Sequence, residues 1–154
     1  MRRLLLLLIA LGIVAFLVVS AVLARVWNAD ASEGAAVTAV IAAEARGQAP
    51  ATVAAIPGCV ARPACRARVT ALSRSLARPG TVEILQRSAS LGFTLGGGTG
   101  TARVAWHTTL VPQPVVQCLR VRRTGSAVSL HGLHVAVLRL SPPIRSDSEC
   151  PAGL

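Results

Sequence analysis

The stretch TARVAWHTT, residues Thr101–Thr109, alternates between two kinds of side chain with a period of two. Successive side chains of a β-strand point to opposite faces of the sheet, so this alternation predicts a strand with one buried face. The two predicted faces are Ala102, Val104 and Trp106 on one side and Arg103, Ala105 and His107 on the other. We expect the first face to contact the core, with Trp106 as a candidate lining residue of a pocket.

A cluster of glycines comes immediately before this strand, at Gly96, Gly97, Gly98 and Gly100. A phosphate-binding loop needs a helix after it, because loop amides and the helix N-terminus hold the anion. Here an alternating stretch follows, the third glycine of a dinucleotide motif is replaced by Thr101, and the chain has no lysine for a P-loop. We therefore expect a hairpin connection, in which glycine supplies positive φ angles.

Helical periodicity precedes the strands. Asp30 and Glu33 have the spacing of a capping box, which predicts a helix that starts at Asp30 and stops at Gly47. A short helix over 51–56 and a third helix from Pro63 to the Pro79-Gly80 pair complete this half.

Alternating stretches follow from Thr81 onward. The predicted strands are TVEILQR (81–87), SLGFTL (90–95), the opening stretch, PVVQCLRVRR (114–123) with a turn at Gly125, and AVSLHGLHVAVLRL (127–140), which we expect to be bulged at Gly132. Residues 141–154 form an irregular C-terminal tail. Helices followed by a run of strands indicate an α+β domain over 30–140, with helices packed on one face of an antiparallel sheet.

The N-terminus is strongly apolar. After the basic residues 1–3, which we assign to the cytoplasm, residues 4–24 carry no charge. A helix of about 20 residues is about 30 Å long and crosses a bilayer core. Cleavable signal peptides have shorter apolar regions of about 7–15 residues, so the length favours an uncleaved, single-pass anchor in a cell membrane, followed by a juxtamembrane linker at 25–29. The small residues at 22–24 leave cleavage and secretion open. The basic N-terminus predicts that the domain lies outside the cytoplasm.

Four cysteines fit an exported domain: Cys59, Cys65, Cys118 and Cys150. An even number in an exported chain suggests two disulfides, for which three pairings exist. We favour Cys59–Cys65, which are close in sequence, and Cys118–Cys150, which would pin the tail to the sheet. A zinc site is the competing interpretation. The spacing lacks paired CxxC knuckles and no histidine stands nearby, so we expect no metal and no other cofactor.

The chain is strongly basic, with 16 arginines against 6 acidic residues and a net charge of +10. The arginines are scattered, which favours a solvated surface over a dedicated anion-binding face. Adhesion to anionic lipid or a wall polymer is the alternative. Only four aromatic residues are present, and single-strand nucleic-acid binding uses aromatic stacking platforms, so we expect no nucleic-acid partner.

Candidate catalytic groups are few. Glu83 and His107 lie on neighbouring predicted strands and can share a face of the sheet, which makes them the one acid/base pair worth testing. His131 and His134 are three positions apart on a strand and point to opposite faces unless Gly132 bulges, which is poor geometry for a joint metal site. No serine stands in a nucleophile elbow. Structural roles are favoured for Glu83 and His107, so an enzyme is the less favoured hypothesis.

The order of elements resembles the NTF2-like (cystatin-like α+β cone) superfamily. It is most similar to the small anchored or secreted bacterial members with a DUF4878-type domain. The stretches that carry the resemblance are AAVTAVIAAEARGQAPATVAAI, PACRARVTALSRSLARPGTVEIL, GTGTARVAWH and PVVQCLRVRRTGSAVSLHGLHV. The resemblance implies about three helices on a curved sheet around a pocket. The family has a strand between its second and third helices, where this chain has PGCVARPAC.

Catalytic members of that superfamily carry an Asp/His pair in the pocket, and no such pair can be matched here. The resemblance therefore implies binding or assembly rather than catalysis. We expect an envelope protein that binds an unidentified ligand or another envelope protein. An NTF2-like hydrolase or isomerase using Glu83 and His107 is the alternative.

Overall fold

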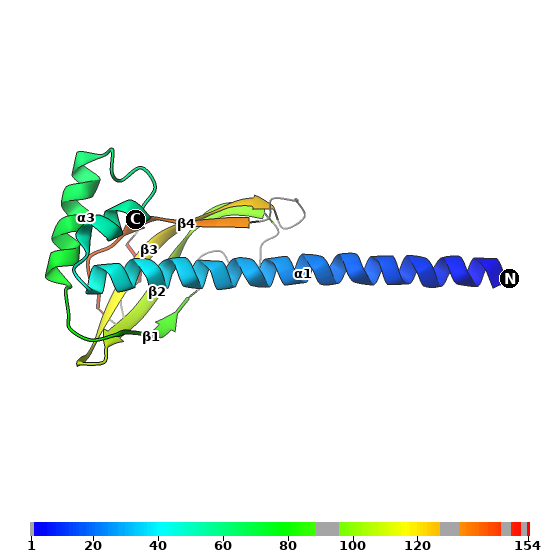
Figure 1. Cartoon of the computed structure of the whole chain (residues 1–154), viewed down its shortest axis with the longest axis horizontal. Helices are drawn as coiled ribbons and strands as arrows, with labels where there is room; N and C mark the ends of the chain where they lie inside the picture. Colours follow the sequence, from blue (N-terminus) through cyan, green and yellow to red (C-terminus); the bar gives the residue numbers. More distant parts are fainter. Residues whose placement is uncertain (1, 89–95, 127–132, 146–148, 152–153) are drawn as a thin grey trace.

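The computed structural model describes residues 2–88, 96–126, 133–145, 149–151 and 154. Three helices precede four strands, in the order α1 (Arg2–Ala45), α2 (Ala49–Ala55), α3 (Pro63–Ser75), β1 (Val82–Arg87), β2 (Gly96–Thr108), β3 (Val111–Ser126) and β4 (Leu133–Leu140). The α+β class predicted from the sequence is confirmed (Figure 1).

Helix α1 is a single helix that includes both the apolar N-terminus and the first helix of the domain. The predicted helix start at Asp30 is wrong, because residues 25–29, predicted as a juxtamembrane linker, are helical as well. These residues contain neither proline nor glycine, so nothing in the local sequence stops the helix. Val26 is the first buried residue among the described side chains of α1, whereas the next residue, Trp27, is exposed. The apolar segment and the domain therefore share one continuous helix.

Local sequence signals mark the C-terminal end of α1 and the starts of α2 and α3. The chain leaves α1 through Gly47, whose φ of +68° suits glycine and few other residues. Pro50 lies in the first turn of α2, and Pro63 in the first turn of α3, where its missing N–H has no cost. The chain between these two helices holds no strand.

The strands form one antiparallel sheet in the order β1-β2-β3-β4, as a simple meander. The alternation predicted for residues 101–109 is confirmed, because every second residue from Ala102 to Thr108 is fully buried. The predicted strand over 81–87 is β1, and the strand over 114–123 lies within the longer β3. The predicted strand over 90–95, together with the bulge at Gly132, lies outside the described residues.

The glycine cluster is part of β2 and not a hairpin connection, so that prediction was wrong. Gly98 pairs with Arg123, Gly100 pairs with Val121, and the register shifts between Gly96 and Gly98. A Cβ atom at Gly97 would stand 2.8 Å from the carbonyl oxygen of Arg123, closer than side chains tolerate. Glycine is needed here because two backbones approach closely at a bulge.

Helix α1 packs along the sheet, whereas α2 and α3 pack against each other and against α1 at the end of the domain opposite to the N-terminus (Figure 1). Residues of all three helices and of the sheet share one apolar core. Helix α1 contributes Val37 and Ile41, and the central strands contribute Trp106 and Leu119, all fully buried. The C-terminal tail continues from β4 along β3, where Ile144 forms a bridge with Val116. The shared core packs the sheet against the part of α1 that follows the apolar segment.

Candidate functional site

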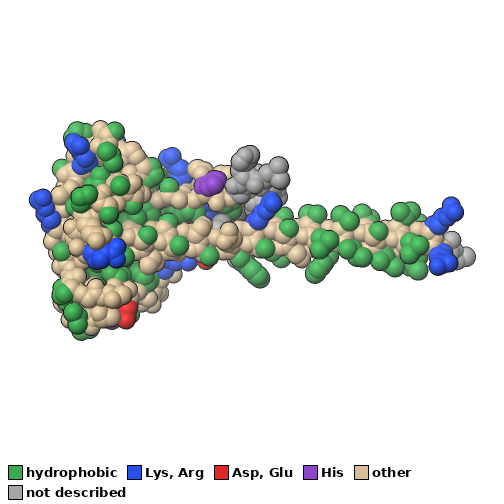
Figure 2. All heavy atoms as spheres, viewed as in Figure 1, with side chains coloured by type: hydrophobic (Ala, Val, Ile, Leu, Met, Phe, Trp, Pro, Cys, Tyr) green, Lys and Arg blue, Asp and Glu red, His purple; other side chains and the backbone are tan. Residues whose placement is uncertain are grey.

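The apolar part of α1 is exposed from Leu4 to Ala21. Figure 2 shows hydrophobic side chains along the visible side of the helix and basic side chains at its N-terminal end. The most apolar window of 18 residues has a mean hydropathy of 3.1, and none of it is buried in the structure. The helix is long and apolar enough to cross a membrane, as an anchor or as a signal segment.

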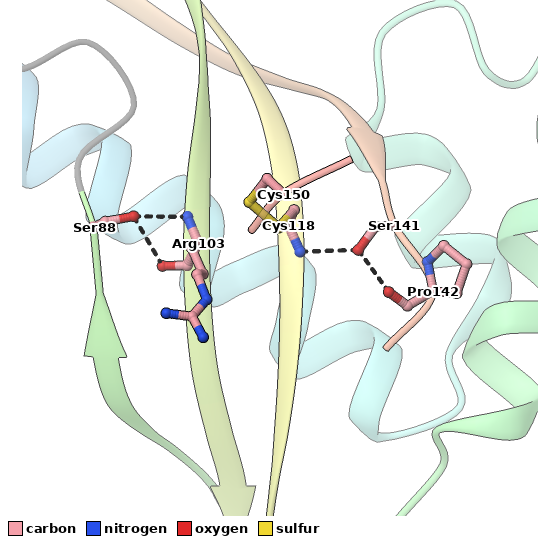
Figure 3. The surroundings of a disulfide bond; sticks show 6 residues. All are labelled: Ser88, Arg103, Cys118, Ser141, Pro142 and Cys150. Atoms are coloured by element: carbon pink, nitrogen blue, oxygen red, sulfur yellow. Dashed lines mark hydrogen bonds between the residues drawn. A yellow bond between two sulfur atoms is a disulfide. The ribbon is translucent and has the colours of Figure 1, made fainter. Parts of the chain in front are cut away.

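Both expected disulfides are formed. Cys59 and Cys65 join the start of α3 to the loop before it, and Cys118 joins β3 to Cys150 in the tail. Figure 3 shows the second bond beside the hydrogen bond from the Cys118 amide to the Ser141 hydroxyl, which is 2.9 Å long. Covalent and hydrogen bonds thus hold the tail against the sheet, and such bonds suit an oxidising compartment.

Glu83 and His107 face each other across β1 and β2. The Nε2 atom of His107 lies 3.0 Å from Oε2 of Glu83. The side chain of His107 is 18% exposed, and that of Glu83 is 55% exposed. The structure therefore brings together the one acid/base pair selected from the sequence. Neither residue lines either of the two cavities described below.

Trp106 is a core residue. Its side chain is fully buried, and its indole N–H donates a hydrogen bond of 2.8 Å to Oε1 of Gln117. The guanidinium carbon of Arg78 lies 5.7 Å from the ring centroid. Trp106 lines neither of the two cavities described below, and its side chain packs in the apolar core.

A buried carboxylate at Glu44 was not singled out from the sequence. It is fully buried on α1, and the amide of Gln117 donates a hydrogen bond of 3.4 Å to its Oε1 atom. Its Oε2 atom has no hydrogen-bond partner in the described structure. Burial raises the pKa of Glu44 to about 7, although the hydrogen bond from Gln117 acts in the opposite direction. The sequence did contain a signal for the burial of Glu44. This residue follows the core residues Val40 and Ile41 by one helical turn, so it lies on the same face of the helix.

A second buried carboxylate, Glu33, lies in an ion-pair cluster that also contains Asp30, Arg87 and Arg123. Arg123 approaches Oε2 of Glu33 at 3.0 Å, and Arg87 approaches Oε1 at 3.6 Å. Arg87 also approaches Asp30 at 3.3 Å. Two acids and two bases thus join α1 to β1 and β3. The sequence assigned Asp30 and Glu33 to a helix cap, whereas their partners lie more than 50 residues away in the chain.

The histidines that the sequence offered as metal ligands are not brought together among the described residues. His134 is exposed on β4, and His131 lies outside the described residues. Within the described ranges, no group of three or more histidine, cysteine, aspartate or glutamate side chains gathers in a way that could hold a metal ion.

Two of the cavities on the surface of the domain are lined by described residues. The first, about 230 Å³, lies between α3 and the end of β4 and has an apolar floor with Arg62, Arg68 and Arg139 around it. The second, about 310 Å³, lies over β1, β2 and β3 on the outer face and includes Leu85 and Arg103. Neither contains a carboxylate. These cavities can bind a ligand, but they lack the acid and base that proton-transfer chemistry needs.

Comparisons with protein-family models, with curated proteins and with solved structures found no match to this chain.

Proposed function

We propose that this chain is a single-pass protein of the bacterial cell envelope whose disulfide-bonded domain lies outside the cytoplasm and acts in binding or protein assembly. The observation that carries this proposal is the continuity of α1, which leads without a break from an exposed apolar segment into a domain with two disulfides. The basic N-terminus would lie in the cytoplasm.

A binding role is favoured over catalysis by the position of the ionisable groups. Neither Glu83 nor His107 lines either of the two cavities, and Glu44 is enclosed in the core. Both cavities are lined by apolar and basic side chains, and the second also by Gln86 and Ser88, which suits recognition of a ligand or partner.

The architecture supports, as a finer proposal, an NTF2-like cone. Three helices followed by an antiparallel meander agree with that layout. The chain departs from it between α2 and α3, where a disulfide-closed loop takes the place of the family's strand. The resemblance adds weight to a ligand-binding role because that superfamily builds pockets between its helices and its sheet.

The topology can be tested with amine labelling, because the chain has no lysine and its N-terminus is the one expected primary amine. A membrane-impermeant amine reagent should label the native chain only after the cells are permeabilised. The matched variant Arg74→Lys, which places an amine on the exposed surface of α3, should be labelled in intact spheroplasts. Labelling of the native chain from outside at full-length mass would contradict the proposed orientation.

The intact mass of the exported chain is measured alongside, with and without alkylation under non-reducing conditions. We expect the full-length mass less four hydrogens, which corresponds to an uncleaved anchor and two disulfides. Four alkylated thiols would contradict the export proposal. A shortened chain would instead show a cleaved signal and a secreted domain.

The binding role is tested by photo-cross-linking in cells from exposed positions on the domain. We would place the cross-linker at Ala71, Leu85 and Leu110, which are exposed on α3, on β1 and between β2 and β3. A discrete adduct with another envelope protein from at least one position is expected. Absence of adducts from all three positions on a correctly exported chain would contradict assembly.

The enzyme alternative is favoured by one observation, the 3.0 Å contact between Glu83 and His107. It predicts a turnover that is lost in Glu83→Gln while the fold stays intact. The adhesion alternative predicts binding to anionic vesicles that weakens steeply with salt, because such attraction is screened within about 10 Å at 0.1 M salt.

A further inference from the structure

The first cavity is a groove between two elements that are far apart in the chain. Its floor is formed by Ile56, Val69, Leu72 and Leu140, which belong to the apolar core or pack against it. The disulfide between Cys59 and Cys65 fixes the start of α3, and Cys65 itself lines the groove. The walls are therefore held in place before any ligand arrives, which lowers the entropic cost of binding.

The rim of the groove is basic. Arg62, Arg68 and Arg139 line it, and no acidic residue does. Arg62 is held in place by hydrogen bonds of 3.1 Å from Nε to the Gly58 carbonyl and from a terminal nitrogen to the Pro57 carbonyl. Arg68 is exposed and takes part in none of the ion pairs of the described residues. A partner with carboxylates beside aliphatic side chains would complement both the rim and the floor.

The groove lies far from the membrane. In Figure 1, α3 is at the end of the molecule opposite to the N-terminus, beside the C-terminal end of α1. The amide of Arg78, just beyond α3, donates to the carbonyl of Ala45 at 2.8 Å. Because about 20 residues of helix separate Ala45 from the apolar segment, this end of the domain stands about 30 Å beyond it. Lipids of the anchoring bilayer therefore do not reach the groove, and their charge is screened over this distance.

We propose that this groove binds a short acidic segment of another protein, with aliphatic side chains on the floor and carboxylates against Arg62, Arg68 and Arg139. The inference rests on the proposed extracytoplasmic binding role and specifies the chemistry of the partner. A protein segment is preferred to a lipid because the groove lies at the end of the domain remote from the apolar segment of α1.

The test uses the full chain in nanodiscs of uncharged lipid and fluorescein-labelled peptides, with binding followed by anisotropy. The probe is a peptide of alternating glutamate and leucine. Peptides of alternating lysine and leucine, and of alternating glutamate and serine, are the controls for charge and for the apolar floor. We expect binding of the glutamate–leucine peptide, none of the lysine–leucine peptide, and at least about tenfold weaker binding of the glutamate–serine peptide.

A matched pair of variants on α3 separates the groove from the general charge of the chain. Arg68 lines the groove and Arg74 does not, although both are exposed on the same helix. Arg68→Gln should weaken binding about fivefold, and Arg74→Gln should change it by less than about twofold. Equal loss in the two variants would overturn the proposal, since it would show attraction to the net charge alone.

A soluble fatty acid, decanoate, tests the other kind of occupant. Binding of decanoate that is lost in Arg68→Gln, with no specific peptide binding, would overturn the proposal in favour of an anionic amphiphile. If neither probe binds while amine labelling and cross-linking give their expected results, the groove inference alone is wrong. If the native chain is labelled from outside at full-length mass, the failure belongs to the proposed orientation.

Discussion

Helix α1 carries two fully buried carboxylates in very different surroundings. Glu33 and Glu44 are eleven positions apart, which is close to three turns, so both point from the same side of the helix into the domain. Glu33 meets two guanidinium groups, from Arg87 and Arg123. Glu44 accepts a hydrogen bond from the amide of Gln117, its Oε2 atom has no partner among the described residues, and its pKa rises to about 7. The same residue type on the same helix is thus paired with two cations in one place and shifted towards its neutral form in the other, because the sheet supplies different partners.

The largest expected effect comes from breaking the cluster at Glu33. Glu33→Gln removes the carboxylate 3.0 Å from the buried Arg123. Removal of one partner of a buried ion pair typically costs about 3–5 kcal/mol, because the other charge stays buried. We expect a loss of this size in the free energy of unfolding, measured by urea denaturation of the full chain in nanodiscs.

The double variant Glu33→Leu with Arg123→Met is the control for this prediction. It replaces the buried pair with apolar groups and should recover most of the lost stability. A loss of under about 1 kcal/mol in Glu33→Gln would show that the ion pair does not join α1 to β3 as the structure indicates.

The second prediction concerns Glu44 and pH. The folded pKa of about 7 lies above the ordinary value of 4.5, so the folded state holds this proton more tightly than the unfolded state. The contribution of Glu44 to stability is therefore fully present below about pH 4.5 and is lost as the pH rises through about 7. The difference amounts to about 3 kcal/mol.

Glu44→Gln isolates this effect because it keeps the shape and removes the ionisation. The variant and the native chain should have similar stability at pH 4.5, and the variant should be the more stable at pH 8. Urea denaturation of both chains across this pH range gives the difference between their free energies of unfolding. The contributions of the other titrating groups are the same in both chains and cancel in this difference. A constant difference between the two chains from pH 4.5 to 8 would contradict the pKa shift.

The smallest effect is expected at Glu83, a carboxylate on the surface. Its contact with His107 is as short as that between Glu33 and Arg123, both being 3.0 Å. Surface ion pairs contribute about 0–1 kcal/mol because solvent screens them. Glu83→Gln should therefore change the free energy of unfolding by less than about 1 kcal/mol, measured by the same denaturation. A loss as large as that of Glu33→Gln would mean that burial does not distinguish the two sites.

Much of this protein was determined by local sequence. Residues 4–24 are apolar enough to form an exposed membrane-length helix, and the alternation of residues 101–109 set which side of β2 faces the core. The pairing of Cys59 with Cys65, and of Cys118 with Cys150, agreed with the expectation from proximity and from the place of the tail. Such features follow from hydrophobic periodicity and short-range chain geometry, which a single sequence carries.

Other features were decided by the tertiary structure. Asp30 and Glu33 have the spacing of a helix cap, but Arg87 and Arg123 bind them from the sheet, and α1 passes through without a break. The glycine cluster has the composition of a turn, yet Gly97 lies in strand β2. Glycine is needed there because the backbone of β3 comes too close for a side chain. The state of Glu44 likewise depends on partners from distant parts of the chain. Burial and long-range pairing set the energies of these groups, and neither can be read from neighbouring residues.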